Sequence, residues 1–173
     1  MYKLYCAFPG CGKSTIYNDA ESFGFFPMIT IPGIITSMSM KAFKDNLKPL
    51  FDSDSSQFDK AEFPQNYIQH IKSHIDFCSG VMPGLTMFVS SHDAVRKALK
   101  ENALDYTLVY PDRSLKEEWI ERYKKRGSPQ SFIDLLTNKW DDFIDSCESD
   151  DGCKERFVLQ SGQGLSDVIK SSL

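Results

Sequence analysis

The stretch Ala7-Phe8-Pro9-Gly10-Cys11-Gly12-Lys13-Ser14-Thr15 decides the fold of this chain. Gly10 and Gly12 can adopt the backbone angles that turn successive N–H groups inward, where a Cβ atom would block the approach of phosphate oxygens. Lys13 can then reach the β- and γ-phosphates of a nucleotide, and Ser14 is placed to ligate Mg²⁺. The stretch therefore predicts a phosphate-binding loop.

The residues on either side supply the strand, loop and helix context that such a loop needs. Residues 3–7 are short, apolar and β-prone, whereas residues 15–20 contain no Gly or Pro and can continue as a helix. The pattern G-x-x-x-x-G-K-[ST] departs at one position, because Ala7 replaces its first Gly. Ala is the smallest substitute, so we retain the phosphate role. The residues predicted to bind the nucleotide in this loop are Pro9, Gly10, Cys11, Gly12, Lys13, Ser14 and Thr15.

Composition excludes several classes of protein. Lys and Arg total 20 against 24 Asp and Glu, so the net charge of −4 argues against attraction of nucleic acid over the whole surface, although a local basic groove stays open. No apolar run approaches the roughly 18 residues of a membrane span, and the N-terminus begins with a strand pattern, not a secretion signal. The cysteines form no C-x-x-C pair, which gives no indication of a zinc site. We expect one cytoplasmic domain over residues 1–173, a monomer or small homo-oligomer without a membrane partner.

Strand and helix patterns alternate along the chain. Apolar, β-prone runs at residues 3–7, 85–93, 106–111 and 156–159 are separated by helical stretches, and a further strand is expected to end near residue 51. This alternation predicts an α/β fold, a three-layer α/β/α sandwich with a mostly parallel sheet of about five strands. Residues 21–48 are expected to be an irregular, variable insert with a short helix near 37–47. Residues 131–147 are expected to form one long helix whose apolar side chains lie in the core.

Two acids follow the strand that ends near residue 51. If the strand continues, Asp52 and Asp54 share one direction at its carboxyl end, where ligands bind in open α/β sheets. One carboxylate could position the phosphoryl acceptor, and Asp52 could ligate Mg²⁺ together with Ser14. The alternative is a solvated Asp/Ser turn that caps the next segment. Ser90 stands where P-loop enzymes usually carry a strand-end Asp. This departure makes Asp52 and Asp54 stronger candidates for the acids on the metal side of the site.

A basic segment lies beyond the strand pattern at residues 106–111. Arg113, Arg122 and Arg126 fall within a helical stretch at about 112–130, which we interpret as a helical lid. Guanidinium groups stabilise the spread negative charge of a migrating phosphoryl group, so these arginines are catalytic candidates. A solvated Glu/Lys/Arg helix surface is the alternative.

The helix pattern that Pro64 opens carries His70 and His74. A single His on a helix is usually structural or exposed. We therefore expect both to be structural or exposed, without a functional role.

Four segments together resemble the small P-loop nucleotide kinases, the adenylate kinase-like and nucleoside or polynucleotide kinase group, in a branch common in bacteriophages. They are the loop at residues 7–15, Asp-Ser-Asp-Ser-Ser at 52–56, Phe-Pro-Gln-Asn-Tyr-Ile at 63–68 and Val-Tyr-Pro-Asp-Arg-Ser at 109–114. The resemblance implies Mg·ATP as the phosphoryl donor, a lid that closes over the phosphates and, for a phage protein, the host cytoplasm. It also implies that the Gly-containing turn at 160–164, with Gln160 and Gly162, lies beside the adenine.

The leading hypothesis is a kinase that moves the γ-phosphoryl group of ATP to a nucleoside monophosphate, such as a deoxynucleotide. A second hypothesis makes the acceptor a hydroxyl on nucleic acid, either a 5′ end or a hydroxymethylated base such as 5-hydroxymethyluracil. A third is an ATP-binding regulator without transfer activity. The catalytic candidates are Lys13, Asp52, Asp54, Arg113, Arg122 and Arg126.

Overall fold

A computed structural model describes residues 1–31, 34–35, 46–80, 82 and 84–171 of the chain. Within them, six strands form one all-parallel sheet in the order β2-β5-β6-β1-β7-β8. The strands of this sheet are β1 (Tyr2–Ala7), β2 (Phe25–Met28), β5 (Lys48–Asp52), β6 (Leu85–Ser90), β7 (Thr107–Pro111) and β8 (Glu155–Leu159). A separate antiparallel pair joins β3 (Thr30–Ile31) to β4 (Ile34–Ile35).

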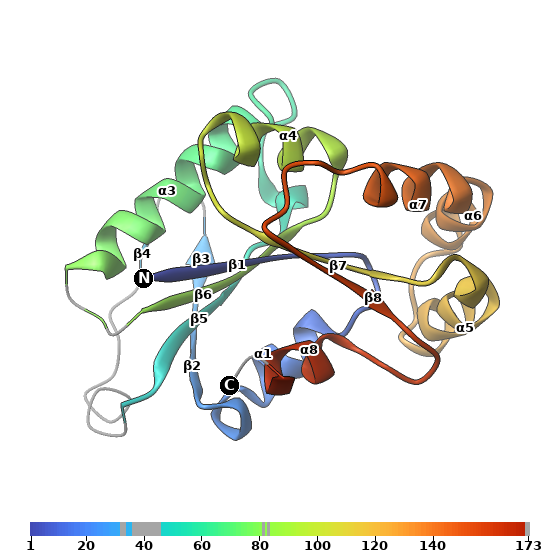
Figure 1. Cartoon of the computed structure of the whole chain (residues 1–173), viewed down its shortest axis with the longest axis horizontal. Coiled ribbons are helices and arrows are strands. Elements are labelled where there is room, and N and C mark those ends of the chain that lie inside the picture. The colour runs from blue at the N-terminus through green and yellow to red at the C-terminus, as the bar shows by residue number, and fades with distance from the viewer. Residues whose placement is uncertain (32–33, 36–45, 81, 83, 172–173) are drawn as a thin grey trace.

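Helices cover both faces of the sheet. They are α1 (Lys13–Asn18), α3 (Gln65–Ser79), α4 (Asp93–Glu101), α5 (Lys116–Lys125), α6 (Gln130–Asn138), α7 (Trp140–Glu148) and α8 (Leu165–Ser171), with 3-10 turns η1 (Ala20–Phe23), η2 (Ser55–Gln57) and η3 (Arg113–Leu115). Figure 1 shows α3, α4 and α7 on one face, α1 and α8 on the other, and α5 and α6 beside the carboxyl ends of β7 and β8. The predicted three-layer α/β/α sandwich is confirmed. No helix within the described ranges is both long and apolar enough to span a bilayer.

The edge strand β2 lies inside the segment that we expected to be irregular. Phe25 and Met28 are buried, and β2 runs parallel to β5. Pro27 is compatible with an edge strand because only one side of that strand must supply N–H groups to the ladder. Gly24, at φ 75°, forms the turn that leads into the strand. The predicted helix near residues 37–47 lies almost entirely outside the described residues.

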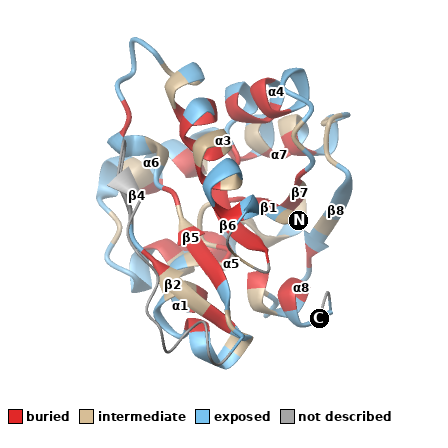
Figure 2. Ribbon diagram, turned by 90° about the vertical axis from the view of Figure 1, so that its left-hand side faces the viewer, coloured by how far each residue is buried: buried red, intermediate tan, exposed pale blue. Residues whose placement is uncertain are grey.

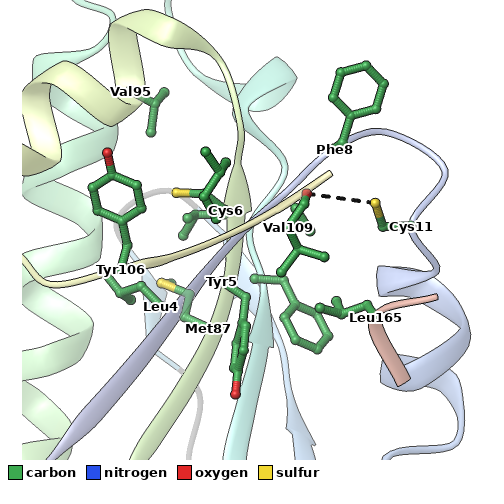
Figure 3. Close-up of a cluster of buried hydrophobic side chains, with 14 of the residues drawn as sticks. Leu4, Tyr5, Cys6, Phe8, Cys11, Met87, Val95, Tyr106, Val109 and Leu165 are labelled. Atoms are coloured by element: carbon green, nitrogen blue, oxygen red, sulfur yellow. Dashed lines mark hydrogen bonds between the residues drawn. The ribbon is translucent and has the colours of Figure 1, made fainter. Parts of the chain in front are cut away.

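The central strands are buried along most of their length, which explains their continuous apolar sequence. Figure 2 shows this burial, and Figure 3 shows the side chains of β1, β6 and β7 packed against α4 and α8. Ala7 is in register with Ser90 of β6 and Val109 of β7. The carboxyl ends of the three central strands therefore meet at one edge, and the loop that follows Ala7 lies at the middle of that edge.

The single long helix predicted at residues 131–147 is two helices. Lys139, at φ −105° and ψ 12°, separates α6 from α7. The change of direction buries Trp140, whose ring packs edge-on against Phe8 and whose Nε1 donates to the carbonyl of Arg113 at 2.9 Å. Leu135, predicted to be a core residue, is 51% exposed on α6.

Candidate functional site

The loop after β1 has the backbone geometry that phosphate binding requires. Gly10 and Gly12 have φ values of 86° and 98°, in the left-handed region that favours glycine. Ala7 ends β1 and lies outside that region of backbone angles. The replacement of Gly by Ala at this position therefore introduces no backbone strain.

Lys13 and the first N–H groups of α1 lie together at the start of the helix. The Nζ atom of half-buried Lys13 donates to the carbonyl of Ala7 at 3.1 Å. Among the described residues, no partner accepts a hydrogen bond from the backbone N–H of Gly12, Lys13 or Ser14. Ser14 and Thr15 are exposed at the start of the helix. The loop thus presents an ammonium group and several uncommitted donors, a set that suits phosphate oxygens.

Cys11 is a structural residue of this loop. Its side chain is buried, and its Sγ lies 3.8 Å from the carbonyl oxygen of Val109, the dashed contact in Figure 3. Burial raises the pKa of Cys11 to about 12. The thiol therefore stays protonated inside the core, where it cannot act as a reactive thiolate.

Asp52 is the last residue of β5, and the positive charge of Lys13 acts on its carboxyl group. Burial raises the pKa of its carboxyl, the positive charge of Lys13 opposes that shift, and the negative charge of Asp54 adds to it. In the part of the chain that the structure describes, the Asp52 carboxylate has no hydrogen bond or ion pair of its own. A half-buried, uncommitted carboxylate beside a lysine is suited to bind a metal ion or to accept a proton.

Asp54 does not continue the strand that Asp52 ends; it caps the 3-10 turn that follows. The strand ends at Asp52, and the carboxylate of Asp54 accepts a hydrogen bond from the N–H of Ser56 at 2.8 Å, capping η2. Asp54 is exposed. Its geometry corresponds to the alternative of a solvated capping turn, and its catalytic role stays a prediction.

Ser90, which ends β6, stands where the sequence led us to look for an Asp, and its contacts in the fold could not be predicted from the sequence. The Tyr67 hydroxyl, on α3, donates to the carbonyl of Ser53 at 2.8 Å and accepts from the N–H of Ser90 at 3.1 Å. This bridge fastens the carboxyl ends of β5 and β6 together beside Asp52. His92 is the N-cap residue of α4, and its ring packs against that of Phe63 with 6.4 Å between centroids. No sequence signal links these residues, because the contacts join separate elements.

Arg113 forms ion pairs with three carboxylates of α7. Its guanidinium donates to the carboxylates of Asp141 at 3.2 Å, Glu148 at 2.8 Å and Asp145, all on α7. These interactions raise its pKa. The geometry favours a structural tie between η3 and α7 over the catalytic role that we expected.

Arg122 and Arg126 are also engaged within the protein. Arg122 donates to the carboxylate of Glu118 at 2.7 Å and to the carbonyls of Gln163 and Gly10 at 2.8 Å and 3.3 Å. Arg126 donates to the hydroxyl of Ser128 at 2.6 Å. Of the two, Arg122 contacts the loop directly, and the contact is to a backbone carbonyl.

The turn at 160–164 lies against the phosphate loop, as expected for a base-binding turn. The N–H of Leu165 donates to the carbonyl of Cys11 at 2.8 Å. A Cβ at Gly164 would lie 3.2 Å from that same carbonyl oxygen, a tight contact that favours glycine at this position. Gly162 has φ 77°, and Gln160 accepts at its carbonyl from the N–H of Gln163 at 3.0 Å. The nucleotide roles of Gln160 and Gly162 stay predictions that this placement supports.

The residues present fit a Mg²⁺–nucleotide complex. Within the described ranges, no cluster of three or more His, Cys, Asp or Glu side chains could hold a metal ion by itself. Mg²⁺ in phosphoryl-transfer sites usually takes one or two protein oxygens and completes its shell with phosphate and water. The exposed hydroxyl of Ser14 and the uncommitted carboxylate of Asp52 are such oxygens.

Comparison with known proteins supports the fold and leaves the substrate open. No protein-family model matches the sequence, and no curated protein matches it. Among solved structures, the chain is similar to the tunicamycin resistance protein of Deinococcus radiodurans, with 14% identity and a TM-score of 0.57 over 98% of this chain and 91% of that one. At this identity the likeness concerns the fold alone.

Proposed function

We propose that this protein is a nucleoside-triphosphate-dependent phosphotransferase, with Mg·ATP as donor and a hydroxyl group as acceptor. The observation that carries the proposal is the pairing of the Lys13 loop with the half-buried carboxylate of Asp52, which ends β5, two strands from β1 in the sheet, and whose oxygens have no partner among the described residues. The loop would hold the triphosphate, and Ser14 would hold Mg²⁺, which supplies charge neutralisation at the β- and γ-phosphates and leaves the Asp52 carboxylate for the acceptor.

The charged groups available to bind the acceptor favour a hydroxyl over a phosphate. The first arginine of the chain is Arg96, so α1, β2, β5 and α3 contain no guanidinium with which to grip an acceptor phosphate. A carboxylate near a monophosphate would repel it, whereas a carboxylate can accept the proton of a hydroxyl. The nucleoside monophosphate acceptor predicted from the sequence remains the second candidate.

The chemical step proceeds from these positions. The acceptor oxygen forms a bond to the γ-phosphorus while its proton passes to the Asp52 carboxylate. The bond between the γ-phosphorus and the β–γ bridging oxygen breaks, and ADP leaves with that bond's electron pair. Lys13 stabilises the charge on the transferred group, and Asp52 later returns its proton to water.

Acceptor-dependent release of ADP tests the proposal. Purified protein with Mg·ATP is given nucleosides, other small hydroxyl compounds, nucleoside monophosphates and single-stranded oligonucleotides. We expect ADP formation with a hydroxyl acceptor, loss of activity in Lys13→Met, and normal activity in the control Lys97→Met, whose lysine is exposed on α4. ATP binding without ADP formation from any acceptor or from water would instead support the non-catalytic regulator. Phosphate appearing only on monophosphates would overturn the hydroxyl assignment.

A further inference from the structure

Helix α5 packs directly on the backbone of the phosphate loop. The Nε1 of Trp119 and the hydroxyl of Tyr123 both donate to the carbonyl of Pro9 at 2.9 Å. A Cβ at Gly10 would lie 2.9 Å from Cε1 of Tyr123 and 3.1 Å from Nε1 of Trp119. The outer arm of the loop is therefore fixed against α5, and only glycine fits at that point.

The same helix binds the turn at 160–164 through Glu118. One carboxylate oxygen accepts from the Ser161 hydroxyl at 2.8 Å, and the other accepts from the N–H of Gly162 at 3.2 Å. These hydrogen bonds, with that from Arg122, lower the pKa of Glu118, so the group is ionised at neutral pH. Glu118 thus connects α5 to the turn that we predicted to lie beside the base.

Arg122 joins the two ends of this arrangement. One guanidinium nitrogen donates to the carbonyl of Gly10 in the loop, and the other donates to the carbonyl of Gln163 in the turn and to Glu118. The guanidinium carbon lies 3.9 Å from the centre of the Trp119 ring. Hydrogen bonds and a cation–π contact hold the group in one geometry, and the Arg122 side chain is only 26% exposed.

We propose that Glu118 and Arg122 are positioning residues that hold the 160–164 turn and the phosphate loop at one spacing, and so set the affinity for the nucleoside triphosphate. The inference rests on the proposed function, because it assumes that the triphosphate lies on the loop and the base beside the turn. A nucleotide that contacts both segments binds more tightly when their separation is fixed in advance, since less ordering accompanies binding. Arg122 then acts on binding, in contrast to the phosphoryl-stabilising role predicted from the sequence.

Affinity and turnover measured separately test this inference. The variants are Glu118→Gln, Arg122→Met and the conservative Arg122→Lys. Glu121→Gln and Lys124→Met are matched controls, because that pair is also joined at 2.7 Å on α5 but is more than half exposed. The dissociation constant of a fluorescent ATP analogue is measured with Mg²⁺ and without acceptor, followed by kcat, KM for ATP and the thermal midpoint.

We expect Arg122→Met and Glu118→Gln to raise the dissociation constant and the KM for ATP by about tenfold, the usual effect of losing a charged hydrogen bond, while kcat changes less than about threefold. Arg122→Lys should recover part of the affinity, and the controls should match the wild type. A fall in kcat with an unchanged dissociation constant would overturn the inference and return Arg122 to the transferred phosphoryl group. Unchanged affinity in both variants, at a normal thermal midpoint, would also overturn it. Failure of the wild type to bind the analogue would overturn the proposed function as well.

Discussion

Asp52 combines three properties that rarely coincide in a structural carboxylate. It ends a buried strand, it lies close to Lys13, and no described residue satisfies its oxygens. Burial favours the neutral carboxylic acid, whereas Lys13 favours the carboxylate, and the balance is a raised pKa. The group therefore takes up a proton more readily than an ordinary Asp, as a proton acceptor in catalysis must.

This balance predicts an acid limb in the pH profile of transfer. Because Asp52 must be ionised to act, and because its pKa is raised, kcat/KM should fall as the pH drops toward that pKa, at a higher pH than an unperturbed Asp would give. Asp52→Asn should lower kcat about 100-fold or more, a typical contribution of a general base, with ATP affinity reduced far less. The measurement is the pH dependence of kcat/KM from neutral pH downward, for the wild type and for Asp52→Asn. An acid limb that persists in residual Asp52→Asn activity would assign it to another group.

At the scale of elements, α3 has two separate tasks. Its first turns carry Tyr67, whose hydroxyl fastens the ends of β5 and β6 beside the candidate site. One turn further on, His70 and His74 are buried, with ring centroids 4.2 Å apart, and their rings pack edge-on against Phe58 and Phe51 respectively. One end of the helix thus positions Asp52, and its middle contributes to the core.

Removing the Tyr67 hydroxyl should affect turnover more than nucleotide binding. Tyr67→Phe leaves the Ser53 carbonyl and the Ser90 N–H without their partner, so the strand ends can shift and Asp52 loses its position. We expect kcat to fall about tenfold or more, since small displacements of catalytic groups are costly, with little change in ATP affinity. Tyr2→Phe is the matched control, because the Tyr2 hydroxyl accepts from the N–H of Asp105 at the opposite end of the sheet. Equal effects of the two substitutions on kcat would refute a positioning role.

The buried histidines predict a loss of stability in mild acid. Burial, with the nearby His74, lowers the pKa of His70 to about 4, so the unfolded chain binds a proton before the folded one does. Stability should therefore decrease as the pH falls from about 6.5 toward 4, by on the order of 2 kcal/mol for His70. Urea unfolding at about pH 7 and pH 4.5, on either side of most of that window, measures the change. His70→Gln should reduce the difference between the two pH values, and a difference of wild-type size in that variant would exclude His70 as its source.

At the scale of the whole molecule, a buried ionic network joins α4 to the acidic turn after α7. Arg96 is 2% exposed and donates to Asp150 at 2.7 Å, to the carbonyl and hydroxyl of Ser146, and to the carbonyl of Ser91. Asp150 also accepts from the Tyr106 hydroxyl at 2.9 Å. The network holds the segment before β8 against the sheet, and β8 leads directly into the 160–164 turn.

Breaking this network should destabilise the whole domain. Arg96→Met leaves Asp150 without its cation in a buried setting, which typically costs about 3–5 kcal/mol. Lys100→Met is the control, because it removes an ion pair with Asp151 of the same 2.7 Å length at an exposed site, where such pairs contribute less than about 1 kcal/mol. Chemical denaturation of both variants checks the difference. Similar losses of unfolding free energy in the two variants would show that burial does not increase the contribution of the Arg96–Asp150 pair to stability.

The parts of the site that depend on local chemistry could be predicted from the sequence. The positive-φ glycines and Lys13 have fixed spacing along the chain, so the loop can be recognised without reference to α5, which packs on it in the folded protein. The helix opened by Pro64 and the central parallel strands also carry local signals. The edge strand at Phe25–Met28 could not be recognised, because Pro27 suits a strand only at an edge, and position in a sheet is a property of the whole fold.

The sequence by itself determined the phosphate loop, the α/β class and the position of Asp52 at a strand end, because short-range spacing and hydrophobic periodicity encode them. Only the tertiary structure decided which charges remain available. It committed Arg113 to the carboxylates of α7, Arg122 to Glu118 and the loop backbone, and Asp54 to a capping turn, and it left Asp52 beside Lys13. The physical reason is that a charged side chain is engaged or uncommitted according to which distant segments fold against it, and a linear sequence does not state those neighbours.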